Sequence, residues 1–269
     1  MRVALVSLNQ RRQDKEANFS RCSDFVRGAR SYGCDLAVFP EMTLTGYSLD
    51  PTAIGEVETG SFTLAHFGEL AQEVGLAIVF GACLIDPSTN RPRNKFCVAW
   101  PDSTSRAIYA KVHPFSFSGE KEVLEAGGRL GAASVGALRF GASICYDLRF
   151  PELYAAMAPA CNAAIAIANW PIRRVARWRV LLVARAIENQ FHMLGVNRIG
   201  IDGSGLVYEK STLAVAPDGT LLQPVMAGEE LDIFDIDPEA AARYRAEFPT
   251  VRDKRYTLYR EFFERIDVK

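Results

Sequence analysis

The sequence has no excess of charge of either sign and no long apolar run. Its 269 residues include 31 basic and 32 acidic side chains, a formal net charge of −1 at pH 7. This balance gives no electrostatic reason to expect binding to nucleic acid or to an anionic membrane. No window approaches the roughly 20 consecutive apolar residues of a membrane-spanning helix, and the first residues lack a signal peptide's apolar segment. We therefore expect a soluble, cytoplasmic protein with neither a nucleic-acid nor a membrane partner.

Histidine is scarce, and the cysteines are not spaced as metal ligands. The chain has 3 histidines and 6 cysteines but no CxxC pair. Because zinc sites combine closely spaced cysteine and histidine ligands, we expect no metal centre. A chain of this length can bury a large core without disulfides, so most of the cysteines are expected to be small buried hydrophobic residues.

Several common catalytic motifs are also absent. The sequence contains no P-loop, no GxGxxG after a strand, no HExxH and no GxSxG. These motifs carry the local geometry for phosphate transfer, dinucleotide binding, zinc-dependent proteolysis and serine hydrolysis. The sequence gives these chemistries no local support, and we expect no organic cofactor.

Short apolar segments alternate with helical segments along the whole chain. Several strands are wholly apolar, which favours sheets covered by helices, an α/β layered sandwich. No linker or change of composition divides the chain, so we expect a single domain over residues 1–269, with 248–269 as a tail of no clear period. Helices are predicted at Ala17–Tyr32, Leu64–Val74, Pro151–Ala158 and Arg174–Asn189, strands at Val3–Leu8, Asp35–Pro40, Ala77–Ile85, Asn94–Trp100, Arg106–Lys111, Leu138–Cys145, Ala163–Ala168 and Met193–Asn197, and a hairpin from Tyr208–Ala216 and Leu221–Val225.

Three chemically complementary residues follow directly after predicted apolar strands: Glu41, Lys111 and Cys145. The ends of strands are where open α/β sheets place their sites. Each residue alone has an ordinary explanation, as a turn acid, a solvated lysine or a core cysteine. Together they supply a base, a cation and a nucleophile. We expect Cys145, at a strand-to-helix bend, to be exposed and to have its thiol pKa lowered by the helix N-terminus.

The segments around these residues resemble the three signature blocks of the nitrilase superfamily, the carbon–nitrogen hydrolases with a Glu-Lys-Cys triad. The likeness covers nearly the whole chain and implies a four-layer αββα sandwich. It also implies a homodimer, with the tail at 248–269 taking part in the contacts. The blocks are Phe39-Pro40-Glu41, Lys111-Val112-His113-Pro114-Phe115 and Ile144-Cys145-Tyr146-Asp147-Leu148-Arg149-Phe150-Pro151-Glu152.

A narrower resemblance, to the ω-amidase branch, lies after the cysteine. Members of that branch hydrolyse the terminal amide of short dicarboxylic acid monoamides. The matching segments are Ala168-Asn169-Trp170-Pro171, Arg174 with Trp178, Ala184-Arg185-Ala186-Ile187-Glu188-Asn189-Gln190 and Asn197-Arg198.

Three departures from the branch pattern keep other substrates open. The segment Met42–Tyr47 is closer to general amidases and carbamoylases, Glu209–Ser211 lacks a glycine before the serine, and Arg177 stands where histidine is expected. An N-carbamoyl amide hydrolase or another aliphatic amidase of the superfamily is therefore the first alternative. A non-catalytic scaffold or binding protein that keeps the fold is the second. A thiol redox protein has no support, because no resolving cysteine lies nearby.

The resemblance implies catalysis through a cysteine thioester, with a small amide as substrate and ammonia as product. Cys145 would attack the amide carbonyl, and Glu41 would take and return the proton. Lys111 and the backbone N–H of Tyr146 would stabilise the oxyanion. The family's second glutamate, which orients the lysine, is assigned to Glu120, with Glu122 as the alternative.

The remaining candidates concern substrate binding. Trp170 is expected to form a wall of the pocket and Asn169 to offer a polar contact. The free carboxylate of a monoamide would be held best by an arginine, which can donate two parallel hydrogen bonds. Arg149, Arg173 and Arg174 all follow predicted strand ends, and Arg174 fits the branch pattern best. His113 is expected to have a structural hydrogen-bonding role.

Overall fold

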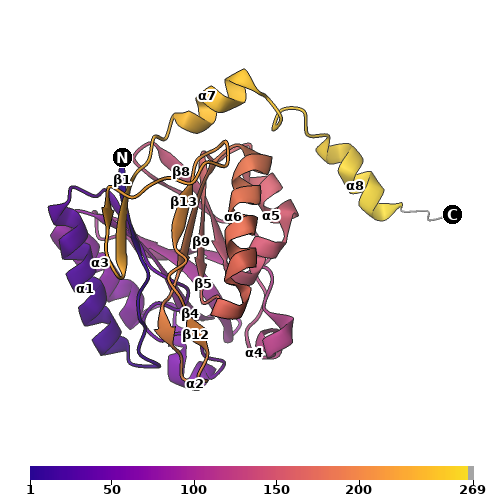
Figure 1. Cartoon of the computed structure of the whole chain (residues 1–269). Coiled ribbons are helices and arrows are strands. Elements are labelled where there is room, and N and C mark those ends of the chain that lie inside the picture. Colours follow the sequence, from indigo (N-terminus) through magenta and orange to yellow (C-terminus); the bar gives the residue numbers. More distant parts are fainter. Residues whose placement is uncertain (266–269) are drawn as a thin grey trace.

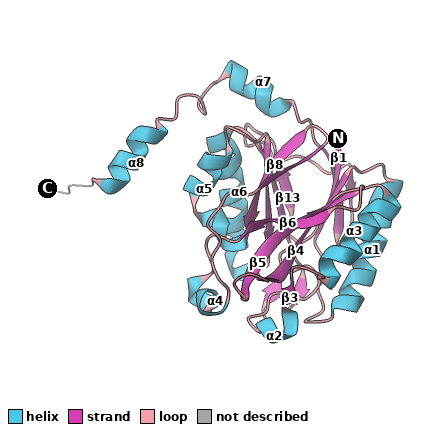
Figure 2. Cartoon of the chain, turned by 180° about the vertical axis from the view of Figure 1, so that it is seen from behind, coloured by secondary structure: helices cyan, strands magenta, loops and turns pink. Residues whose placement is uncertain are grey.

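The structure, a computed structural model, describes residues 1–265 and consists of two β-sheets packed face to face between helices (Figure 1). Helices α1 (Lys15–Ser31) and α3 (Phe62–Val74) cover the outer face of the first sheet. Helices α5 (Pro151–Met157) and α6 (Val175–Asn189) cover the outer face of the second. Figure 2 shows the same four layers from behind. The predicted αββα sandwich is confirmed.

The first sheet is eight-stranded among the described residues, and the second is five-stranded. A small ribbon pairs β11 (Gly200–Ile201) with β12 (Val207–Tyr208). The first sheet has the order β14 (Met226–Ala227), β15 (Leu231–Asp235), β1 (Arg2–Val6), β2 (Leu36–Val38), β4 (Ala77–Asp86), β5 (Arg91–Ala99), β6 (Ser105–Ala110), with β3 (Glu56–Val57) beside β4. The second has the order β13 (Leu213–Val215), β10 (His192–Asn197), β9 (Ala163–Ala168), β8 (Leu138–Ile144), β7 (Ala132–Val135).

Alternating side chains explain why the sheets are buried on both faces. In β1, Val3 and Leu5 point into the core between the two sheets, whereas Ala4 and Val6 pack under α1 and α3. Successive residues of a strand face opposite sides, so a strand covered on both sides reads as a continuous apolar run. The second sheet repeats this pattern in β9, whose six residues are all buried.

Strand direction brings the ends of distant segments to one edge. Strands β1, β2 and β4 are parallel, and so are β8, β9 and β10. Strand β6 runs antiparallel to β5, which is itself antiparallel to β4, so β6 has the direction of β2. The residues that follow β2, β6, β8 and β9 meet at the carboxyl edge of the two sheets, where Glu41 contacts Lys111 and Asn169, and Cys145 lies beside Asn169.

Two predictions about local structure were wrong. The segment 208–216 is not one strand, because buried Ser211 and Thr212 bond to Asn197 and the chain re-enters the sheet only at β13. One isolated bridge, Val215 to Leu221, is left of the predicted hairpin. The tail was predicted to have no period, yet it forms α8 (Tyr256–Glu264) after α7 (Ala240–Glu247), and both helices extend beyond the sandwich in Figure 1.

The remaining described helices are short. They are α2 (Pro51–Ile54), α4 (Glu120–Val123) and the 3-10 turns η1 (Ser116–Ser118), η2 (Cys145–Arg149) and η3 (Ile172–Arg174). Residues 266–269 of the predicted tail lie outside the described part of the chain. Among residues 1–265, no helix is both long and apolar enough to cross a lipid bilayer.

Candidate active site

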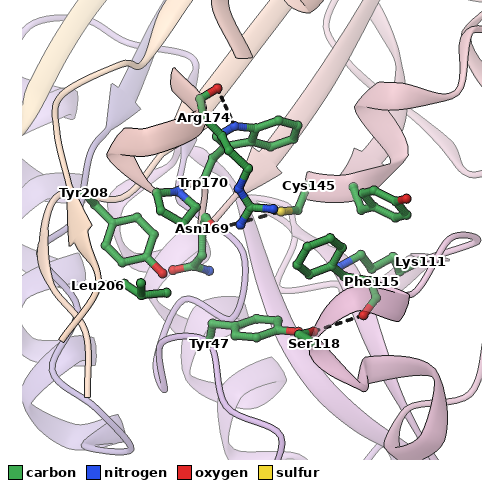
Figure 3. A pocket seen from close by; sticks show the side chains of 12 residues that line it. Tyr47, Lys111, Phe115, Ser118, Cys145, Asn169, Trp170, Arg174, Leu206 and Tyr208 are labelled. Atoms are coloured by element: carbon green, nitrogen blue, oxygen red, sulfur yellow. Dashed lines mark hydrogen bonds between the residues drawn. The ribbon is translucent and has the colours of Figure 1, made fainter. Parts of the chain in front are cut away.

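A small cavity of about 90 Å³ lies at the carboxyl edge of the two sheets (Figure 3). Tyr208 and Leu206 lie on one side of it, and Phe115 and Lys111 lie on the other. Five of the twelve lining residues are aromatic, and the polar groups come from Lys111, Cys145, Asn169, Arg174 and four hydroxyls. The lining residues are Tyr47, Lys111, Phe115, Ser118, Cys145, Tyr146, Asn169, Trp170, Pro171, Arg174, Leu206 and Tyr208.

Glu41 lies beneath this cavity, fully buried at the end of β2. One carboxylate oxygen, Oε1, accepts from Lys111 Nζ at 3.0 Å and from Asn94 Nδ2 at 2.7 Å. The other, Oε2, accepts from the backbone N–H of Asn169 at 3.0 Å. These donors hold the carboxylate in one orientation without exposing it to water.

The backbone around Glu41 explains this placement. The next residue, Met42, has φ +48°, an uncommon value for a residue with a Cβ. The strand end also presses against Gly81 of β4, where an added Cβ would lie 2.5 Å from the Met42 nitrogen. Glycine at this position therefore lets the turn that carries Glu41 approach the neighbouring strand.

Lys111 follows β6 and joins Glu41 to a second buried carboxylate, that of Glu120. Its Nζ lies 2.8 and 3.0 Å from the two carboxylate oxygens of Glu120, and both side chains are at most 1% exposed. Burial alone would lower the pKa of Lys111, but the charges of Glu41 and Glu120 outweigh it and raise that pKa well above its usual value. Lys111 is therefore a cation in the folded protein.

Of the two glutamates considered from the sequence, Glu120 is the one brought to Lys111. Glu120 begins α4 and also accepts from the Phe115 N–H at 2.7 Å. Glu122, two residues further along α4, is exposed.

Cys145 sits at the bend between β8 and η2 with φ +50°, a strained value for a residue other than glycine. Its Sγ lines the cavity and lies 4.0 Å from the Asn169 carbonyl oxygen. The predicted lowering of its pKa was wrong. Burial and the negative charge of Glu41 raise the pKa of the thiol, and Lys111 offsets only part of the rise. Cys145 is therefore a thiol at rest and needs a base to become a nucleophile.

Asp147 joins the Cys145 bend to the Lys111 loop. Its Oδ2 accepts from the Ile144 N–H at 2.9 Å and from the Tyr109 hydroxyl at 2.8 Å. Its Oδ1 accepts from the His113 N–H and lies 2.8 Å from His113 Nδ1. His113 stacks on Phe150 with ring centroids 3.7 Å apart, in keeping with the structural role predicted for it.

The three arginines considered for a substrate carboxylate lie in different places. Arg174 lines the cavity, with its guanidinium 4.9 Å from the Phe115 ring centroid and 5.9 Å from that of Trp170. Arg149 lies 5.1 Å over the Trp170 ring and is not part of the cavity lining. Arg173 is exposed. Within residues 1–265, Arg174 forms no salt bridge, so its charge is available to a ligand.

Comparison with known proteins places this geometry in a family. The model of the carbon–nitrogen hydrolase family matches residues 2–246. The chain belongs to this family. This carbon–nitrogen hydrolase is 30% identical to the omega-amidase YafV of Escherichia coli (strain K12), over 82% of this chain and 84% of that protein. It is also 30% identical to the 2-oxoglutaramate amidase of Paenarthrobacter nicotinovorans, over 91% and 85% of the two chains.

A solved structure agrees with these relatives. The carbon–nitrogen hydrolase superposes on Saccharomyces cerevisiae Nit3, described as a member of branch 10 of the nitrilase superfamily, with a TM-score of 0.81 and 26% identity. The match covers 93% of this chain and 94% of the yeast chain. The predicted membership of the nitrilase superfamily, in an ω-amidase-like branch, is confirmed.

Sequence reasoning missed much of the cavity wall and its supports. Leu206 and Tyr208 come from the β11–β12 ribbon and its turn, where no local pattern marks a binding residue. Tyr47 and Phe115 lie in segments that resemble the family, but nothing in those segments assigned them to the cavity wall. Asn94 gave no signal either, because it stands between Arg93 and Lys95 at the start of the predicted strand, where a polar residue is ordinary. Tyr146, Asn169 and Trp170, three of the residues singled out from the sequence, follow β8 and β9 and line the cavity.

Proposed function

We propose that this carbon–nitrogen hydrolase cleaves the terminal amide of a small dicarboxylic acid monoamide through a thioester on Cys145 and releases ammonia. One observation carries the proposal. A single cavity brings the Cys145 thiol beside the buried Glu41–Lys111–Glu120 group and within the same walls as the unpaired guanidinium of Arg174. The first group suits amide cleavage, and the second suits a free carboxylate on the same substrate.

Acylation begins with proton transfer from Cys145 to Glu41. The Sγ attacks the amide carbonyl carbon, and the carbonyl π electrons move to oxygen. Lys111 and the Tyr146 N–H stabilise this oxyanion, each such donor being worth about 2.7–4 kcal/mol in the transition state. The tetrahedral intermediate collapses, the C–N bond breaks, and Glu41 returns the proton to the leaving nitrogen, which departs as ammonia.

Deacylation repeats these roles with water. Glu41 takes a proton from a water molecule, whose oxygen attacks the thioester carbonyl. The C–S bond breaks, the substrate leaves as the dicarboxylic acid, and the proton returns to Cys145. Glu120 acts through Lys111, since its carboxylate holds the ammonium in place and keeps its pKa high.

The substrate class follows from the walls of the cavity. Its volume, about 90 Å³, is well below the roughly 300–1,000 Å³ of sites for drug-sized ligands, which favours a short acyl chain. Arg174 is held between Phe115 and Trp170, and Arg149 supports Trp170 from outside the cavity. Asn169 offers a polar contact beside Cys145. The names of the relatives from E. coli and P. nicotinovorans support an amide of this kind.

Arg174→Met tests the carboxylate-binding part of the proposal. A hydrogen bond to a charged group contributes about 1.5–3 kcal/mol, so we expect KM for a dicarboxylate monoamide to rise roughly 10- to 150-fold with a smaller change in kcat. For the monoamide whose carboxylate is methyl-esterified, the variant and the wild type should perform alike. Initial rates of ammonia release at several substrate concentrations measure both.

Arg173→Met is the matched control. It removes the neighbouring, exposed guanidinium from the same turn and should leave both substrates unaffected. Equal losses in Arg174→Met for the free acid and the ester would contradict a carboxylate-binding role.

The assembly is also a proposal. We infer a homodimer that joins copies through the outer face of α5 and α6, with the tail 248–269 crossing the contact. In support, Val180 and Ile187 of α6 are 68% and 49% exposed, and Phe262 and Phe263 of α8 are 56% and 70% exposed. Exposed apolar side chains of this size are usual at subunit contacts. The single-domain organisation and the cytoplasmic location stay predictions from the sequence.

A further inference from the structure

Asn94 is a buried polar residue in the middle of β5 that no motif marks and that the mechanism above does not use. It is 1% exposed and touches each of the three charged residues below the cavity. The backbone carbonyl oxygen of Asn94 accepts from the backbone N–H of Lys111 at 2.9 Å. Its Nδ2 donates to Glu41 Oε1 at 2.7 Å and to Glu120 Oε1 at 3.1 Å.

The orientation of this carboxamide is fixed by its partners. Both side-chain partners are carboxylate oxygens, which accept and cannot donate while ionised, so the atom facing them is the NH₂ group. The other end, Oδ1, is buried and has no hydrogen-bond partner in the described chain. An unpaired buried acceptor lowers the free energy of unfolding. Whatever Asn94 contributes must therefore come from the two hydrogen bonds that its NH₂ group donates.

We propose that Asn94 is the positioning residue that, together with Lys111, occupies Glu41 Oε1 and so makes Oε2 the atom that takes and returns the proton. A carboxylate oxygen has two lone pairs, and those of Oε1 face Lys111 Nζ and Asn94 Nδ2. At Oε2 the Asn169 N–H donates at 3.0 Å, and Asn169 Nδ2 adds only a long hydrogen bond of 3.4 Å. The shorter bond of that Nδ2, at 2.7 Å, goes to the Glu41 backbone carbonyl, so Oε2 is the more weakly occupied oxygen. The inference rests on the proposed role of Glu41 as proton acceptor.

The second half of the role concerns charge. Glu41 faces the Lys111 cation, the Glu120 carboxylate, the Cys145 thiol and, further off, the Tyr47 hydroxyl. Two carboxylates share one lysine, so by formal charge the group is negative by one, and the two carboxylates repel each other. By donating to both carboxylates, Asn94 offsets part of the repulsion between them and holds Glu41 in the orientation seen here.

The test is the pH dependence of the reaction in Asn94→Leu. Removing a hydrogen-bond donor from a carboxylate raises its pKa. The acid limb of the pH profile, where kcat/KM falls as the pH is lowered, should therefore move to higher pH by roughly one unit. Asn94→Asp has the same shape and packs in the same place. It replaces the donor with a third carboxylate, so it should move the limb in the same direction even if Asn94→Leu folds poorly.

Gln10→Met is the matched control. Gln10 is another buried carboxamide beside Glu41, but its Nε2 donates to the backbone carbonyls of Glu41, Met42 and Thr43 and not to the carboxylate. A general disturbance of this turn would lower the rate in Gln10→Met without moving the acid limb. An acid limb that stays at the wild-type pH in both Asn94 variants would overturn the inference.

A second readout separates this inference from the proposed function. The rate of Cys145 alkylation by iodoacetamide requires the same proton transfer to Glu41 but no amide substrate, and mass spectrometry identifies the alkylated cysteine. Suppose that the wild type fails to release ammonia while the acid limb of the alkylation rate still moves to higher pH in the Asn94 variants. In that case the substrate assignment fails and the role of Asn94 stands. If the wild type turns over and neither limb moves, the role of Asn94 fails alone.

Discussion

Cys145→Ala is expected to reduce ammonia release by a factor on the order of 10⁴ or more, because no other group in the cavity can form the thioester. The change removes only a sulfur atom that already faces a cavity, so the protein should remain folded, with a melting curve close to that of the wild type. Alkylation by iodoacetamide, followed by mass spectrometry, should lose the modification of the peptide that carries this residue.

Cys161→Ala is the matched control for this prediction. Cys161 is another cysteine of the second-sheet side, 2% exposed and packed in the core beneath α5 and α6. Its removal should lower stability slightly and leave kcat unchanged, because it lies outside the cavity lining. Near-normal ammonia release by Cys145→Ala would exclude the thioester mechanism.

Glu41→Gln is expected to lower kcat by roughly 10²- to 10⁴-fold, the usual contribution of a general acid–base group. The effect should be at the large end because the raised pKa of Cys145 makes the thiol dependent on a base. The glutamine NH₂ must also face Lys111 and Asn94 or the Asn169 N–H, all of which are donors. An unsatisfied buried donor costs about 1–3 kcal/mol, so we also expect a lower free energy of unfolding.

Single-turnover rates of ammonia release on the same substrate measure the loss in acylation. Comparing them with the steady-state kcat shows the loss in deacylation. Glu122→Gln makes the same chemical change at an exposed position and should leave both steps unaltered. A Glu41→Gln variant that keeps more than a tenth of the wild-type kcat would remove Glu41 from the role of base.

Local pattern was enough to predict most strands and to place three candidate catalytic residues at their ends. The all-apolar segment Ala163–Ala168 is a strand with the predicted bounds, because a strand buried on both faces has no polar alternation to blur its limits. Glu41, Lys111 and Cys145 were found because parallel strands end at one edge, a rule that needs only strand direction.

Other features depended on contacts that no local pattern records. Asn94 meets Glu41 across 53 positions of sequence, and Asp147 meets Tyr109 across 38. The pKa of Cys145 was misjudged for the same reason. The helix end next to it in sequence suggested a lower value, whereas burial and the Glu41 carboxylate, supplied by a different strand, raise it. Helix α8 was missed although Tyr256, Tyr259 and Phe263 stand at the i, i+3, i+7 spacing of an amphipathic helix.

The most direct test of the central claim is the product balance from a four- or five-carbon dicarboxylate monoamide incubated with the purified wild-type protein. We predict one ammonia and one dicarboxylic acid for each amide consumed, with no carbon dioxide. If the folded protein, with its Cys145 open to alkylation, released no ammonia from this substrate but released ammonia and carbon dioxide from an N-carbamoyl amide, the carbamoyl alternative would replace the ω-amidase. If the protein released no ammonia from either substrate, the result would contradict an amidase and favour the non-catalytic alternative.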